Sequence, residues 1–170
     1  KEIHAVFGTE YQTSVLGQGR VVRNFGTGLV PFGGVVRLTA IPQPGYYFAL
    51  WGNAASSVVN PLDFTVTNAN PTVGAFFLPL GANQATLTVL EEGAGVVARE
   101  PEANAYTKGQ VVQLTAQPFP GQNFLGWAGD ASGTQNPLAV TASTNQTIAA
   151  TFTHQLGLAI QQWPGLTHSR

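Results

Sequence analysis

Apolar and polar residues alternate with a period of two along several short stretches of this chain. In residues 36–40 (VRLTA) and 112–116 (VQLTA), every second residue is apolar. A period of two is typical of a half-buried β-strand. The stretches end at Gly and Pro, because Pro lacks the ladder donor and Gly supplies the positive φ of a turn. The pattern therefore predicts short strands joined by tight turns, and residues 46–53 alone are also compatible with one helical turn.

These strands recur as a repeat. The segment VVRLTAIPQPGYYFALW ends at Trp51, the segment VVQLTAQPFPGQNFLGW ends at Trp127, and the two tryptophans lie 76 positions apart. The offset extends upstream to two Gly-x-Gly triplets and downstream to two Asn-Pro-Leu triplets, and it becomes 75 at the closing strands. An internal repeat of this kind predicts two small modules built from the same supersecondary unit.

The ends of the chain repeat the pattern in part. The closing-strand pattern occurs once more at Ile3, Ala5 and Phe7, and the opening-strand pattern at Leu156, Leu158 and Ile160. We therefore divide the chain into the closing strand of a preceding repeat (1–9), a first repeat (10–80), a second repeat (81–153) and the opening strand of a following repeat (154–170). This phase predicts an array that is longer than the chain.

Each module needs an apolar core in spite of its small size. The aromatic residues expected to form the two cores are Phe48, Trp51 and Phe77 in the first repeat and Phe124, Trp127 and Phe152 in the second. Truncating a buried aromatic side chain costs about 3–5 kcal/mol, which is comparable with the whole stability of a small domain. This cost explains why both copies have such residues.

Composition narrows the class of protein. Charged residues make up only 9% of the chain and apolar residues 44%, so Thr, Ser, Gln, Asn and Gly must fill most of the surface, as is typical of extracellular bacterial β-proteins. The chain has no Cys, which excludes disulfides, zinc–thiolate sites and thiol catalysis. The few Lys and Arg are scattered, whereas nucleic-acid binding needs clustered cations. No apolar run approaches the roughly 18 residues of a membrane span.

The repeat resembles the divergent InlB B-repeat family, which occurs in tandem in bacterial surface and secreted proteins. The matching residues read GGVVRLTAIPQPGYYFALW and GQVVQLTAQPFPGQNFLGW, each followed by Asn-Pro-Leu and a closing Ala-x-Phe. The resemblance implies compact β-rich modules that act as spacers, adhesive segments or appendages of exported enzymes, and it brings no catalytic residues. The expected fold is all-β: two tandem modules, β-grasp-like or small sandwiches, with partial repeats at both ends.

Candidate chemistry is sparse. Glu91, Glu92, Glu100 and Glu102 lie in and after the Gly-x-Gly hairpin of the second repeat, and a solvated hairpin explains them better than a glycosidase pair facing across a cleft. Asp130 in the segment GDASG is the single metal candidate, but one local carboxylate fits loop capping better than calcium, which takes roughly six or more oxygens. We expect no catalytic residue, no cofactor and no metal.

Three functions remain open. The first is a non-catalytic structural or adhesive module of a larger extracellular bacterial protein, whose partners are neighbouring repeats or copies of itself. The second is a carbohydrate-binding module of a secreted glycoside hydrolase, in which Tyr46, Tyr47, Tyr106 and Trp163 would stack on a polysaccharide. The third is a filament subunit that donates its terminal strands head to tail, because unpaired edges recruit strands from other chains.

Overall fold

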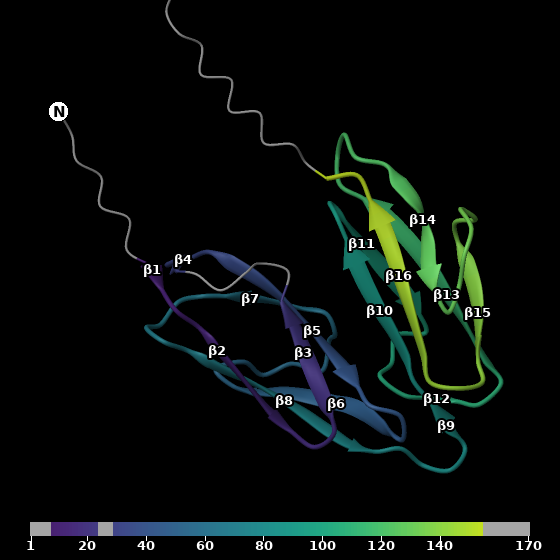
Figure 1. The fold of residues 1–170 in the computed structure, drawn as a ribbon, viewed down its shortest axis with the longest axis horizontal. Coiled ribbons are helices and arrows are strands. Elements are labelled where there is room, and N and C mark those ends of the chain that lie inside the picture. The colour runs from purple at the N-terminus through teal and green to yellow at the C-terminus, as the bar shows by residue number, and fades with distance from the viewer. Residues whose placement is uncertain (1–7, 24–28, 155–170) are drawn as a thin grey trace, which may run out of the picture.

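The computed structural model describes residues 8–23 and 29–154, which form two β units that lie next to each other (Figure 1). The described residues contain strands and turns but no helix, so the all-β prediction is confirmed. The predicted terminal strands at Ile3, Ala5, Phe7, Leu156, Leu158 and Ile160 lie outside the described residues, as does Trp163.

Both units have the same order of strands. The first contains β1 (Gly8–Thr9), β2 (Gln12–Leu16), β3 (Gly19–Arg23), β4 (Val30–Pro31), β5 (Val35–Pro42), β6 (Tyr46–Asn53), β7 (Leu62–Thr65) and β8 (Thr72–Pro79). The second contains β9 (Gln84–Ala85), β10 (Leu87–Glu92), β11 (Gly95–Glu100), β12 (Tyr106–Thr107), β13 (Gln110–Pro118), β14 (Phe124–Gly129), β15 (Leu138–Ala142) and β16 (Gln146–Phe152).

Each unit, as far as it is described, packs two three-stranded sheets over one core. The sheets have the orders β2-β8-β6 and β3-β5-β7 in the first unit, and β10-β16-β14 and β11-β13-β15 in the second. Strand β2 pairs in parallel with β8, and β10 pairs in parallel with β16. The other strand pairs are antiparallel. Because both sheets contribute buried residues to a common cluster, each unit is a small sandwich.

The short strand β1 pairs within the first unit as β9 does within the second. Gly8 and Thr9 pair with Pro31 and Val30 of β4, just as β9 pairs with β12 in the second unit. These two residues thus pair with a strand of the first unit, and the division of the chain into repeats stays a prediction.

The Gly-x-Gly turn does not close a hairpin, which corrects the interpretation from sequence. Strand β10 before it pairs with β16, whereas β11 after it pairs with β13, so the chain changes sheets at this turn. Gly93 has a φ of 97°, where side chains are strained, and a Cβ at Gly95 would lie 2.5 Å from the ring of Phe152. The first glycine is therefore needed for the backbone and the second for the core, and the first unit repeats this arrangement around Phe77.

A β-bulge places two aromatic residues, three positions apart, on the same face of β6. Regular alternation would send Phe48 and Trp51 to opposite faces, yet both are buried and their ring centroids lie 4.8 Å apart. The pairing with β8 shifts between Phe48 and Leu50, and an extra residue of this kind restores a common direction. Residues 46–53 thus form a strand and not a helical turn, and β14 has the same irregularity.

Aromatic contacts complete each core. Phe48 also packs against Phe77 with ring centroids 5.9 Å apart. In the second unit, Phe124 lies 4.9 Å from Trp127 and 5.8 Å from Phe152. The structure therefore places all six of these aromatic residues around the two cores, with Phe124 half-buried at the edge.

The Asn of each Asn-Pro-Leu triplet has a structural role for which the sequence offered no reason. The Asn60 side chain accepts a hydrogen bond from the Ala40 N–H at 2.9 Å and donates one to the Ala40 carbonyl at 2.8 Å. Asn136 makes the same two bonds with Ala116, at 2.9 and 2.8 Å. The side-chain amide thus replaces a neighbouring strand for one residue of the central strand.

We expect Asn136→Ala to lower the free energy of unfolding by about 2 kcal/mol, because both backbone groups of Ala116 lose their partner. Urea denaturation followed by tryptophan fluorescence measures the change. The matched control is Asn68→Ala, because Asn68 is exposed. Equal stability of Asn136→Ala and the control would contradict this role.

We expect Gly95→Ala to destabilise the second unit by about 1–3 kcal/mol, because the added methyl group overlaps a packed aromatic ring. Thermal unfolding of this variant should be compared with Gly81→Ala, in which the nearest atom is the flexible end of Gln84, 3.1 Å from the added Cβ. A melting temperature for Gly95→Ala equal to that of Gly81→Ala would show that the ring can move aside.

Candidate functional site: the junction between the two repeats

The most extensive polar contacts between the two units lie where the outer face of sheet β3-β5-β7 meets β10 and β11. Strand β5 points Val36 and Leu38 into its own core, so the alternating Arg37 and Thr39 point to the other face. Strand β10 lies against β5, and Thr39 is only 8% exposed. The polar face predicted for β5 is therefore covered by the second unit.

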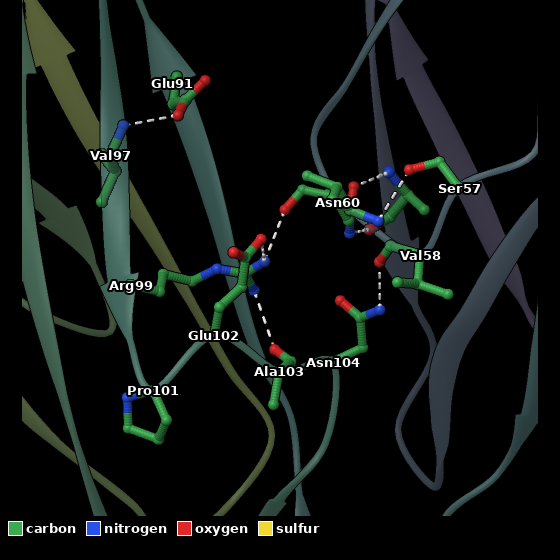
Figure 2. A network of polar contacts seen from close by, with 12 residues as sticks. Ser57, Val58, Asn60, Glu91, Val97, Arg99, Pro101, Glu102, Ala103 and Asn104 are labelled. Carbon is green, nitrogen blue, oxygen red and sulfur yellow. Dashed lines mark hydrogen bonds and ion pairs between the residues drawn. The ribbon is translucent and has the colours of Figure 1, made fainter.

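An ion triad joins the units across this junction. Arg37 on β5 lies 3.2 Å from Asp63 on β7, measured from Nε to Oδ1, and 3.0 Å from Glu91 on β10, measured from Nη1 to Oε2. The other oxygen of Glu91 accepts a hydrogen bond from the Val97 N–H at 2.7 Å (Figure 2). One oxygen of Glu91 thus accepts a hydrogen bond, and the other lies in an ion pair with Arg37.

Glu91 corrects the expectation that the four glutamates of this region are solvated. Its side chain is 3% exposed, whereas Glu92, Glu100 and Glu102 are exposed as expected. Burial raises the pKa of Glu91 above its ordinary value, and the charge of Arg37 and the Val97 amide oppose this rise without cancelling it. The carboxylate therefore carries a net desolvation cost, which is typical of a buried ion pair.

In a second set of contacts, Arg99 and Asn104 of the second unit donate hydrogen bonds to backbone carbonyls of the first unit. Arg99 on β11 donates from Nη2 to the carbonyl of Asn60 at 2.8 Å and from Nη1 to the carbonyl of Ala103 at 3.2 Å. Asn104 donates to the Val58 carbonyl at 2.7 Å. Figure 2 shows both side chains reaching from the second unit to the loop before β7. The Arg99 side chain is 5% exposed, and its planar fork holds two acceptors in fixed directions.

A cavity of about 790 Å³ lies beside these contacts. The first unit lines it with Val35 and Arg37, and the second with Glu92, Phe119 and His154. Its wall alternates apolar and charged side chains, so it extends the junction and has the character of an interface more than of a catalytic pocket.

The aromatic residues proposed to bind a polysaccharide do not form one exposed row. Tyr106 is 1% exposed, and its hydroxyl group donates to the Pro101 carbonyl at 3.1 Å. The expectation that its ring stacks on a ligand is therefore wrong. Tyr46 and Tyr47 are half-buried neighbours on β6, and successive residues of a strand point to opposite faces.

Asp130 holds a loop. Its carboxylate accepts a hydrogen bond from the Thr147 N–H at 2.7 Å, and its own N–H donates to the Thr147 carbonyl at 3.0 Å. Within residues 8–23 and 29–154, no three His, Cys, Asp or Glu residues gather as metal ligands. In that part of the chain no helix has the length and apolarity to cross a membrane.

Sequence reasoning missed the junction, although one signal for it was present. At the 76-residue offset, the equivalents of Arg37 and Glu91 are the uncharged residues Gln113 and Val15. A charge that occurs in one copy only is not needed by the fold, so it is a candidate for a contact that one copy alone makes. The partners themselves depend on how the two units dock, which the strand pattern does not contain.

Comparison with known proteins agrees with the fold. A family model described as "Divergent InlB B-repeat domain" matches residues 11–80 and 85–156. No curated protein and no solved structure matches the chain.

We expect the stability of Glu91→Gln relative to the unmodified chain to rise with pH. Because the folded-state pKa of Glu91 is raised above the ordinary 4.5, the folded state holds this proton more tightly than the unfolded state. Ionisation therefore reduces stability as the pH rises from 4.5 through the raised value, and glutamine is not subject to this loss.

Urea denaturation of both chains from about pH 4 to about pH 7 gives this difference. Glu100→Gln, at an exposed position, is the matched control. The same pH dependence in both variants would contradict the assignment to the buried carboxylate.

Proposed function

Because this chain belongs to the divergent InlB B-repeat domain family, we propose that its tandem repeats form a non-catalytic spacer in a larger extracellular bacterial protein. In this role, the junction holds successive repeats at a fixed orientation. The chain would thereby hold neighbouring domains or repeats at a set distance and angle. Any catalytic activity of the larger protein would belong to other domains.

The observation that carries this proposal is the buried Arg99 side chain, which donates to the Asn60 carbonyl across the junction. If a flexible linker joined two units that moved independently, such a side chain would be exposed to water. Here Asn60 is also buried, at 8% exposed, and Asn104 adds a second bond to the same loop. Directional bonds between buried groups resist rotation of one unit against the other, because rotation would leave donors and acceptors unpaired.

The low charge and the polar surface support an extracellular location for the spacer, together with the family. An adhesive role is compatible with this proposal but needs a partner surface. Polysaccharide binding has less support, because Tyr106 is buried and Tyr46 and Tyr47 are half-buried on opposite faces of one strand.

We expect Arg99→Ala to broaden the distribution of orientations between the two units, because the junction loses a charged hydrogen bond worth about 1.5–3 kcal/mol. The chain has no Cys, so spin labels can be attached at Gln43→Cys and Thr144→Cys, which are exposed positions in different units. Pulsed electron spin resonance then reports the distribution of distances between the labels.

Arg20→Ala is the matched control, because Arg20 is exposed. The labelled chain and this control should give one narrow distance distribution, and Arg99→Ala a wider one. A wide distribution in the otherwise unmodified chain would overturn the proposed rigid spacer.

A further inference from the structure

The two faces that meet at the junction occur twice in the chain, and within residues 8–23 and 29–154 one copy of each is left uncovered. The outer face of sheet β3-β5-β7 in the first unit is repeated by that of sheet β11-β13-β15, where Gln113 and Ala139 stand in place of Arg37 and Asp63. We call it the downstream face. The edge formed by β10 is repeated by β2, where Val15 stands in place of Glu91. We call it the upstream edge.

Residues on these two surfaces are more exposed than their equivalents at the junction. On the upstream edge, Val15 is 44% exposed, whereas the side chain of its equivalent Glu91 is 3% exposed at the junction. On the downstream face, Gln113 is exposed, whereas the side chain of its equivalent Arg37 is 19% exposed at the junction. Asn136 is exposed as well, although its equivalent Asn60 is buried at the junction.

The residues that stand in place of the ion triad on these two surfaces are all uncharged. If they met as the junction surfaces do, Val15 would face Gln113 and Ala139, so no unpaired charge would be buried. Arg23 is the equivalent of Arg99, and the carbonyl of Asn136 is the equivalent of the carbonyl that Arg99 binds. The backbone contact would thus be kept while the ion triad is replaced by neutral residues.

Arg23 is already held near the upstream edge. It donates from Nη2 to the Thr13 hydroxyl group at 2.8 Å, and its guanidinium carbon lies 5.0 Å from the centroid of the Tyr11 ring. A guanidinium group has five donors, so several remain for a carbonyl on another chain. Because these contacts already order its side chain, Arg23 loses less conformational entropy on association than a freely rotating arginine would.

We propose that a second copy of this chain docks head to tail, its upstream edge on the downstream face of the first, in the geometry of the internal junction. The contact is heterologous, so each docked copy still presents one upstream edge and one downstream face to further copies. It uses the faces of described strands and is independent of the donation of terminal strands. The inference goes beyond the proposed spacer and rests on the same junction geometry.

Sedimentation velocity of the chain over a series of concentrations tests this docking. We expect the average mass to rise with concentration, without stopping at a dimer. Gln113→Arg should weaken association at least about tenfold, because it places an unpaired charge opposite Val15. Leu125→Arg is the matched control: Leu125 is exposed on β14, in the other sheet, so association should be unchanged.

Combining Gln113→Arg with Val15→Glu should restore association, because the pair reproduces the contact between Arg37 and Glu91. A chain that stays monomeric at about 1 mM, where even weak contacts form, would overturn the proposal. So would growth that stops at a closed dimer, or a loss of association equal in Gln113→Arg and Leu125→Arg.

The two proposals fail in different ways. The spacer is tested by distances within one chain, and docking by the mass of the assembly. A narrow distance distribution in a chain that never associates would leave the spacer in place and remove the docking alone.

Discussion

The tryptophan of the first repeat connects its core to the surface that binds the second unit. The ring of Trp51 packs against Phe48, while its Nε1 donates to the Val59 carbonyl at 2.9 Å. This bond holds the loop in which Val58 and Asn60 turn their carbonyls towards the second unit, where Asn104 and Arg99 bind them. A buried indole thus fixes the acceptors of the junction, and Trp127 fixes the same loop in the second unit through Gln135.

Features shared by both repeats and features found in one serve different purposes. The aromatic clusters, the Gly-x-Gly turns and the Asn side chains recur because each unit must fold from the same plan. Arg37, Asp63 and Glu91 occur once because they belong to one particular docking. The fold therefore sets where a repeat can be bound, and a few outward side chains on that surface decide which neighbour fits.

The sequence was informative where a feature depends on neighbours along the chain. The alternation in residues 36–40 and the 76-residue offset led to strands, repeats and an all-β fold. The bulge after Phe48, the change of sheet at Gly93 and the burial of Glu91 were missed, because each depends on which strand lies alongside. Alternation shows that Arg37 points away from its own core, but it does not show that a second unit covers that face.

The ion triad contributes specificity more than it contributes stability. The raised pKa of Glu91 shows that its partners do not fully offset the cost of burial, and well-packed neutral residues often do as well as a buried ion pair. A mismatched neighbour, however, would leave either Arg37 or Glu91 buried beside an uncharged group, which costs more than the pair itself. Charge at the internal junction therefore disfavours docking of either junction surface on an uncharged one.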